Sequence, residues 1–216
     1  MPPEVKICGL KTPDAVAAAV EGGADYLGFV FFDRSPRNLT PADARPLVAM
    51  ATGGIVAVGV FVDPDDALLA AAVETAGIGA IQLHGRETPE RVDAVRARFG
   101  LPVIKALPVA GAADLAAAAR FAAADRLLFD AKPPAGADRP GGHGVAYDWA
   151  ILKDARIAPA AGPWFLSGGL TPETVAQAVR ASGAGAVDVS SGVEDASGVK
   201  SVARIEAFAR AARAIR

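Results

Sequence analysis

The chain has 216 residues, 52% of them hydrophobic, so it can bury a substantial core in one large α/β domain or two small ones. A net charge of −2 without a Lys/Arg cluster argues against a nucleic-acid partner. No apolar stretch approaches the roughly 18–20 uncharged residues that span a bilayer, which argues against a membrane partner. Cys8 is the single cysteine, so no internal disulfide can form. The first apolar run begins at Val5, so we expect no secretory signal. We therefore expect a cytoplasmic protein.

Signals for helix starts recur along the chain. In each, a Thr or Asp that can accept a backbone N–H precedes a proline, which tolerates the first helical position because it has no N–H to lose. The signals are Thr12-Pro13, Thr40-Pro41, Asp63-Pro64, Thr88-Pro89 and Thr171-Pro172. Consecutive signals lie roughly 25 residues apart, which is typical of a repeated βα unit.

Glycines predict where these helices end. Gly22-Gly23, Gly77 and Gly183 each lead into an apolar run, and glycine just past a helix accepts the left-handed conformation that ends it. A three-to-four-residue spacing of apolar positions predicts a last helix with one buried face. Its apolar positions are Val202, Ile205, Phe208, Ala212 and Ile215.

Eight short apolar runs lie between the predicted helices. They are nearly continuous rather than alternating, as expected for parallel strands covered on both faces. The runs are Val5–Cys8, Tyr26–Phe31, Ile55–Val62, Ala80–Leu83, Val103–Leu107, Leu127–Phe129, Trp164–Leu166 and Ala186–Val189. We predict one α/β domain over residues 1–216, a single (β/α)8 (TIM) barrel of eight parallel strands. An open doubly wound sheet would more often have five or six strands and a dinucleotide fingerprint.

The longest irregular stretch runs from Pro133 to Gly144 and is rich in Pro and Gly. Within a tight repeat, a loop of this size predicts a mobile cover over an active site rather than a domain boundary.

Polar side chains gather where the predicted strands end, while the strand middles contain almost no charge. In barrels of this class the active site lies at the carboxyl ends of the strands, so we predict the site there. The candidate residues are Cys8, Arg37, Gln82, His84, Asp130, Gly168, Gly169, Asp188, Ser190, Ser191 and Gly192.

Cys8 and Asp130 are the candidate acid–base pair. A thiol at a strand exit can serve as a base if nearby cations or dipoles lower its pKa, although a small buried hydrophobe is the plainer interpretation. An acid that ends Leu127-Leu128-Phe129 is expensive to bury unless it is used or paired. A hydrogen-bonded structural carboxylate is the alternative for Asp130.

Ser167-Gly168-Gly169 and Ser190-Ser191-Gly192 follow the seventh and eighth strands. Loops at these places frequently bind phosphate, since glycine lets backbone amides approach an anion. The alternative is a pair of ordinary strand-to-helix turns.

Arg37 can bind a carboxylate through its planar guanidinium or remain a solvated loop charge. His84 can bond a neighbouring loop, and no metal-ligand spacing involves it or His143. No nucleotide-binding loop, dinucleotide fingerprint or nucleophile elbow is present.

Several motifs together resemble the phosphoribosylanthranilate isomerase family over essentially the whole chain. They are Lys6-Ile7-Cys8-Gly9-Leu10, Gly28-Phe29-Val30-Phe31 with Ser35-Pro36-Arg37, Gly59-Val60-Phe61-Val62, Gln82-Leu83-His84-Gly85, Leu128-Phe129-Asp130, Leu166-Ser167-Gly168-Gly169-Leu170 and Asp188 to Glu194. The first and last motifs in combination are specific to that family among phosphate-binding barrels.

The resemblance implies isomerisation of N-(5-phosphoribosyl)anthranilate to 1-(2-carboxyphenylamino)-1-deoxyribulose 5-phosphate, an Amadori rearrangement in tryptophan biosynthesis that needs no cofactor. It implies that Asp130 is the general acid and Cys8 the general base. Arg37 would bind the anthranilate carboxylate, Asp188 the sugar hydroxyls, and the glycine and serine loops the phosphate. Gln82 and His84 are further candidates for substrate binding. We expect a small phosphosugar–anthranilate ligand and a monomer or homodimer.

The sixth loop departs from the family pattern. Members often have Gly-Gly, Ser or Thr, Gly and then a basic residue, whereas this chain has Gly141-Gly142-His143-Gly144-Val145. This difference concerns loop closure rather than the acid–base pair.

Three rival functions remain open. A dual-substrate sugar isomerase that also processes a histidine-pathway intermediate resembles this barrel but has an aspartate where Cys8 stands. A phosphate-dependent lyase or synthase would need a catalytic lysine or glutamate inside the barrel, for which Lys105 is the candidate lysine. A non-catalytic phosphosugar-binding protein would retain the glycine loops without needing both Cys8 and Asp130.

Overall fold

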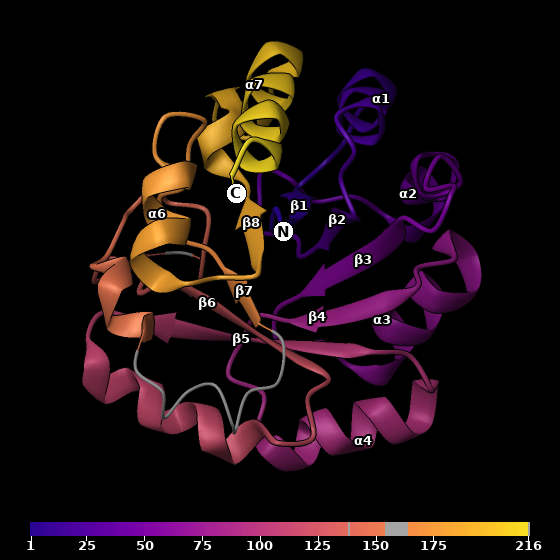
Figure 1. Cartoon of the computed structure of the whole chain (residues 1–216). Coiled ribbons are helices and arrows are strands. Elements are labelled where there is room, and N and C mark those ends of the chain that lie inside the picture. The colour runs from indigo at the N-terminus through magenta and orange to yellow at the C-terminus, as the bar shows by residue number, and fades with distance from the viewer. Residues whose placement is uncertain (138, 154–163, 216) are drawn as a thin grey trace.

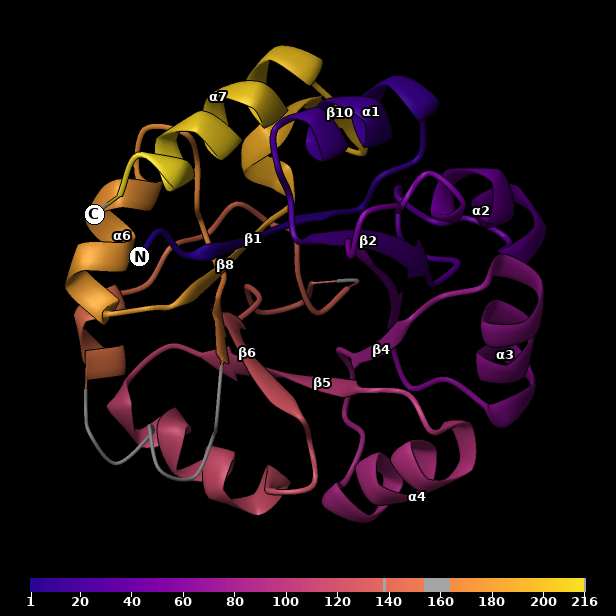
Figure 2. The same ribbon diagram turned by 45° about the vertical axis from the view of Figure 1, so that its right-hand side comes forward.

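A computed structural model describes residues 1–137, 139–153 and 164–215 of the chain. Eight parallel strands pair in sequence order, and β8 closes on β1, so the predicted (β/α)8 barrel is confirmed. The helices surround the strands, which occupy the centre (Figures 1 and 2). The strands are β1 (Glu4–Cys8), β2 (Tyr26–Phe31), β3 (Val56–Phe61), β4 (Ala80–Leu83), β5 (Val103–Val109), β6 (Arg126–Ala131), β7 (Trp164–Leu166) and β8 (Ala186–Val189).

The connections between strands are helices and short helical turns. The α-helices are α1 (Pro13–Glu21), α2 (Pro41–Val48), α3 (Asp66–Ala71), α4 (Pro89–Phe99), α6 (Val175–Ser182) and α7 (Val202–Arg213). One segment, η1 (Ala72–Ala76), is a π-helix, which winds more widely than an α-helix. The more tightly wound 3-10 helices are η2 (Ala112–Phe121), η3 (Trp149–Lys153) and η4 (Ser191–Val193). Within the described ranges, no helix is both long enough and apolar enough to cross a membrane.

The strand predictions are confirmed in place but not at every boundary. The sixth strand extends to Ala131, so Asp130 lies within it rather than after it. A small antiparallel hairpin, β9 (Glu194–Ala196) with β10 (Val199–Lys200), follows β8 and was not predicted. Its strands are too short and too polar to give a strand signal.

Three of the five helix-start predictions are confirmed by their caps. The side chains of Thr12, Thr40 and Thr88 accept the backbone N–H three residues ahead, and proline follows each as the first helical residue. Helix ends are also as expected, since Gly77 and Gly183 both have the left-handed conformation.

The other two helix starts were placed too early. α3 is capped by Asp65, whose Oδ1 accepts the Leu68 N–H at 2.8 Å, while Asp63 lies in the preceding turn with φ at 46°. The sixth helix begins at Val175 rather than after Thr171. Thr171 instead accepts the Glu173 N–H at 3.2 Å, which forms a local turn that delays the helix.

Side chains alternate along each strand between the barrel interior and the helix layer. The interior cluster consists of Cys8, Val30, Val58, Val60, Ala80, Ile104, Ala106, Leu128, Phe165 and Ala186. A larger cluster packs between barrel and helices and includes Ile205, Phe208 and Ala212 of the last helix. Val202 was predicted on that buried face but is 40% exposed, because it opens the first turn of α7.

The expectation of almost uncharged strand middles was wrong. Lys6, Lys105 and Asp188 are buried strand residues with charged side chains. Lys105 lies between Ile104 and Ala106, which both face the interior, so its own side chain faces the helix layer. There its Nζ donates to Glu87 Oε2 at 2.7 Å. Lys105 therefore does not supply a lysine inside the barrel, as a lyase or synthase would need.

Gly59 marks a place where strand β3 and the helix layer meet too closely for a side chain. A Cβ at Gly59 would lie 2.6 Å from Ile78 Cδ1 and 2.7 Å from Phe61 Cε2. We expect Gly59→Ala to lower the free energy of unfolding by about 1–3 kcal/mol, measured by urea denaturation. Gly79→Ala is the matched control, because its Cβ would meet no atom closer than 3.7 Å. Equal stability of the two variants would contradict this account of the packing.

Candidate active site

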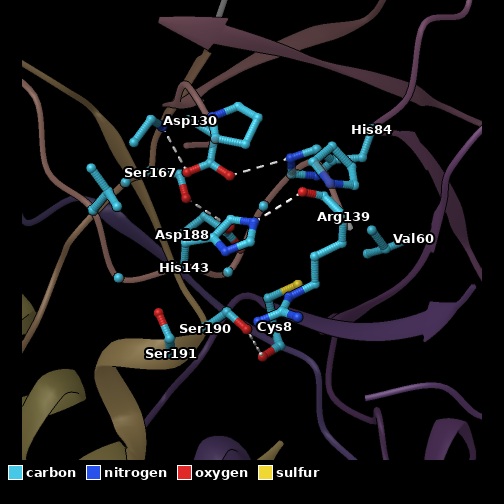
Figure 3. A pocket seen from close by; sticks show the side chains of 18 of the residues that line it. Cys8, Val60, His84, Asp130, Arg139, His143, Ser167, Asp188, Ser190 and Ser191 are labelled. Carbon is cyan, nitrogen blue, oxygen red and sulfur yellow. Dashed lines mark hydrogen bonds and ion pairs between the residues drawn. The ribbon is translucent and has the colours of Figure 1, made fainter. Parts of the chain in front are cut away.

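Strand ends and loops enclose a pocket at the carboxyl end of the barrel. Cys8 enters it from β1 and Asp130 from β6, with β8 and β7 between them around the barrel. Figure 3 shows the labelled side chains converging on this space. The other candidates that line the pocket are Arg37, His84, Gly168, Gly169, Asp188, Ser190, Ser191 and Gly192. The barrel thus brings together ten of the eleven candidate residues.

Gln82 is the exception, because it is fully buried and does not line the pocket. Its Nε2 lies 3.0 Å from Nδ1 of His84, and Nε2 of His84 lies 3.3 Å from Asp130 Oδ2. The Gln82 amide and the Asp130 carboxylate thus contact opposite nitrogens of the same ring. Gln82 therefore reaches the pocket only through His84, and its role in substrate binding stays a prediction.

Asp130 has two well-defined neighbours. Its Oδ1 accepts the backbone N–H of Ala131 at 2.9 Å, and its Oδ2 faces His84. The side chain is almost buried yet opens into the pocket. A carboxyl in this position can give a proton to a bound ligand while its orientation is fixed from behind.

Cys8 shares the interior of the barrel with a buried ion pair. Lys6, two residues earlier on β1, donates from Nζ to Asp188 Oδ1 at 2.7 Å, and Ser167 Oγ donates to Asp188 Oδ2 at 3.2 Å. Burial raises the pKa of the Cys8 thiol above its ordinary value, and the Lys6 charge opposes that rise. The pKa of Lys6 is itself raised, because the charges of Asp188 and Cys8 outweigh the effect of burial.

Arg37 is held rigidly by Glu194. Nε and Nη2 of Arg37 each donate to one carboxylate oxygen of Glu194 at 2.7 Å, a bidentate geometry that fixes the guanidinium plane. Lys200 Nζ donates to the same carboxylate at 2.7 Å and to the Ser190 carbonyl at 2.8 Å. Burial alone would raise the pKa of Glu194, but its hydrogen bonds to Arg37 and the charge of Lys200 hold that pKa below the usual value.

The glycine and serine loops pack closely against their neighbours. Gly168 and Gly169 both have positive φ, and a Cβ at Gly168 would lie 2.7 Å from the backbone nitrogen of Ala131. A Cβ at Gly192 would lie 1.8 Å from the Leu170 carbonyl oxygen, so no side chain fits there. Ser190 Oγ donates to the Cys8 carbonyl at 3.1 Å, which links the eighth loop to the first strand.

The loop after β6 covers the pocket, as predicted for the stretch from Pro133 to Gly144. A Cβ at Gly141 would lie 2.7 Å from Asp130 Oδ2, and one at Gly142 would lie 2.7 Å from Arg37 Nη1. The two glycines therefore bring backbone directly over the predicted acid and the predicted carboxylate-binding arginine. The mobility of this loop stays a prediction, and residue 138 lies outside the described residues.

Comparisons with known proteins place this chain in a family. The family model for N-(5'phosphoribosyl)anthranilate (PRA) isomerase matches residues 5–211. The chain belongs to this family.

Relatives from this family match the chain over nearly their full length. The N-(5'-phosphoribosyl)anthranilate isomerase of Paramagnetospirillum magneticum is 57% identical over 99% of this chain and 98% of that protein. The crystal structure of phosphoribosyl anthranilate isomerase from Thermotoga maritima has a TM-score of 0.88 and 34% identity, covering 99% of this chain and 100% of the other. Another isomerase structure, in complex with reduced 1-(o-carboxyphenylamino)-1-deoxyribulose 5-phosphate, has a TM-score of 0.85 and 32% identity, with the same coverage.

The sequence did not predict the contacts of three charged residues with the candidate site: Lys6 with Asp188, Glu194 with Arg37, and Lys200 with Ser190. Lys6 stands in an apolar strand two residues before Cys8. That spacing puts two strand side chains on one face and was a usable signal. The partnership of Glu194 with Arg37, 157 residues away, left no local trace in the sequence.

The Glu194 carboxylate should make stability depend on pH in a specific window. Because its pKa in the folded protein lies below the usual 4.5, its ionisation stabilises the fold above that value. This stabilisation is lost as the pH falls through the lowered pKa. We expect Glu194→Gln to lower the free energy of unfolding by about 3 kcal/mol near neutral pH, since Arg37 and Lys200 would lose their counterion.

Urea unfolding at several pH values tests this expectation. The difference between wild type and Glu194→Gln should shrink as the pH falls below about 4.5, where the wild-type carboxyl also becomes protonated. Glu206→Gln, at an exposed position of α7, is the control and should show no such trend. A difference that stays constant over this range would contradict the assigned ion-pair network.

Proposed function

We propose that this protein isomerises N-(5-phosphoribosyl)anthranilate to 1-(2-carboxyphenylamino)-1-deoxyribulose 5-phosphate, a step of tryptophan biosynthesis. The observation that carries the proposal is that Cys8 and Asp130, from different strands, line one pocket together with Arg37 and the glycine loops. The family membership and the product-like ligand of a related structure support the same substrate class.

Asp130 is the general acid of the proposed Amadori rearrangement. It gives its proton to the furanose ring oxygen, the C1′–O bond breaks, and the sugar opens to a Schiff base with the anthranilate nitrogen. The nearby His84 ring and the Ala131 N–H orient the carboxyl and accommodate the carboxylate that remains.

Cys8 is the general base of the next step. Its thiolate removes the proton from C2′, which gives an enolamine, and this tautomerises to the C2′ ketone. The position of Cys8 across the pocket from β6 supports this division of roles, because an acid and a base are needed at different atoms of one sugar. No cofactor takes part in either step.

The remaining contacts follow from charge. Two cations, Arg37 and Lys200, share the single carboxylate of Glu194, so this part of the site carries an excess of positive charge that suits the anthranilate carboxylate at Arg37. Asp188 is suited to accept from sugar hydroxyls. The backbone around Gly168, Gly169, Ser190, Ser191 and Gly192 is suited to the phosphate.

A cytoplasmic location and a monomeric or homodimeric state belong to the proposal as well. Rescue of a tryptophan-requiring strain that lacks this isomerase is the direct test of the activity. Assay with the histidine-pathway substrate distinguishes a dual-substrate isomerase, and ligand affinity without turnover would favour a non-catalytic binding protein. Growth without tryptophan only in strains carrying the active protein is the expected result.

Loss of either acid–base group should abolish most of the activity. We expect Asp130→Asn and Cys8→Ala each to lower kcat by about two orders of magnitude or more, the range for removal of a general acid or base. Steady-state assays on purified, folded variants test this. Asp93→Asn, on the exposed side of α4, is the control for the amide substitution. Wild-type turnover in either variant would contradict the acid or base role assigned to the substituted residue.

Removal of the Arg37 guanidinium should act mainly on binding. Arg37→Ala is expected to raise KM with a much smaller change in kcat, because the carboxylate contact exists in the ground state as well as the transition state. Glu194 would then lose one of its two cations, so the variant's folding is checked by circular dichroism before assay. A large kcat defect at unchanged KM would contradict this assignment.

A further inference from the structure

A fully buried lysine lies next to Cys8 and has no role in the steps above. Lys6 has no solvent exposure, and its Nζ donates to Asp188 Oδ1 at 2.7 Å. Because Lys6 and Cys8 are two residues apart on β1, both side chains point into the barrel interior. Gly28, on the neighbouring strand, leaves the space that they share. A Cβ there would lie 2.9 Å from Cys8 Sγ and 3.1 Å from Lys6 Nζ.

Stability alone does not account for this ion pair. Both members of a buried ion pair lose their hydration on folding. Apolar residues of similar volume often stabilise a fold equally well or better. Lys6 and Asp188 are also partners in the register of β1 and β8, a position that any two apolar strand residues could fill. The location of the ammonium beside a thiol therefore calls for a chemical explanation.

We propose that Lys6 is a positioning residue for Cys8, its ammonium, anchored by Asp188, stabilising the thiolate that removes the substrate proton. This rests on the proposed function in one respect, the role of Cys8 as base. Lys6 itself remains protonated throughout. The thiol releases its proton to water, the thiolate then takes the proton from C2′, and Cys8 returns to the thiol form.

Among the charged groups around Cys8, Lys6 is the cation with the largest effect on the pKa of the thiol. Burial raises the pKa of the thiol, and the charge of Lys6 is the strongest influence against it. Asp188, from β8, acts in the same direction as burial, whereas Lys200, from β10, adds a weaker opposing charge. Arg139 and His143, from the loop over the pocket, line the same space. Lys200 also donates hydrogen bonds to Glu194 and to the Ser190 carbonyl, so the Glu194 carboxylate partly neutralises its charge.

Because the chain has a single cysteine, the titration of its thiol reports on Cys8 alone. The informative comparison is Asp188→Asn against the double variant Lys6→Met/Asp188→Asn, since the residue at position 188 is then neutral in both. The ultraviolet absorbance of the thiolate and the rate of alkylation by iodoacetamide are followed against pH. We expect the pKa of Cys8 in the double variant to be higher by about one to three units. At a fixed pH below that pKa, alkylation should then slow by about tenfold or more. Equal titration curves would overturn the proposal.

A second buried ion pair provides the matched control. Lys105 and Glu87 are similarly buried and 2.7 Å apart, but they lie on the helix side of the barrel. Lys105→Met/Glu87→Gln should leave the Cys8 titration at its wild-type position. If this control raised the Cys8 pKa as much as the loss of Lys6 does, the effect would be a general loosening of the barrel, and the proposal would fail.

The pH profile of catalysis separates an electrostatic role from a structural one. In Lys6→Met, kcat should fall at neutral pH and recover as the pH approaches the raised pKa of the thiol. A defect that is uniform over pH would contradict the proposal. If Lys6→Met does not fold with Asp188 unpaired, the titration of the neutral double variant decides the question. A Cys8→Ala variant with full activity would refute the role of Cys8 as the base, whereas the effect of Lys6 on the thiol titration would still stand.

Discussion

A buried ion pair bridges the two strands at which the barrel closes. Lys6 of β1 and Asp188 of β8 are partners in the strand register, and their side chains meet at 2.7 Å inside the barrel. The pleat then places Cys8 two residues further along on the same interior face. Asp188 also accepts a hydrogen bond from the hydroxyl of Ser167, the residue directly after β7, so one carboxylate links β1, β8 and the end of β7. The geometry of the thiol side of the site therefore depends on the same contact that links the first and last strands.

The loops that cover the pocket pack closely because glycines at their contact points have no side chains. Gly141 and Gly142 let the sixth loop lie directly on Asp130, His84 and Arg37, and Gly168 and Gly192 let the seventh and eighth loops approach their neighbours. Each of these positions lacks room for a Cβ next to another part of the site. The three loops consequently form one layer of closely packed backbone above the strand ends. Backbone amides in such a layer can face an anion without an intervening side chain.

The sequence predicted the barrel because its signals are local and repeated. Thr12, Thr40 and Thr88 cap helices through contacts three residues away, and most strand residues are apolar on both faces. The two misplaced helix starts, at Asp63 and Thr171, arose because the same cap-like residues also form turns.

The candidate site residues could be predicted because they lie at the ends of strands. Residues whose partners are distant in the sequence could not be predicted in this way. Strand ends of a barrel converge, so polar residues placed there met in one pocket. Whether a lysine in a strand faces the interior or the helices depends on the pleat at that residue, which distinguishes Lys6 from Lys105. Glu194 joins Arg37 only because the β9–β10 hairpin folds over the second loop, and no local pattern encodes that contact.

The proposed acid–base chemistry on one sugar requires that the acid and the base keep different protonation states in a shared cavity. Here the two groups have separate electrostatic surroundings. Asp130 faces a histidine and a backbone amide on the β4–β6 side, whereas Cys8 faces an ammonium and a carboxylate on the β1–β8 side. Burial keeps the resting cysteine in its thiol form, so the nearby lysine charge limits the free energy needed to form the thiolate. A barrel can separate two such groups because each strand end contributes one side chain with its own neighbours.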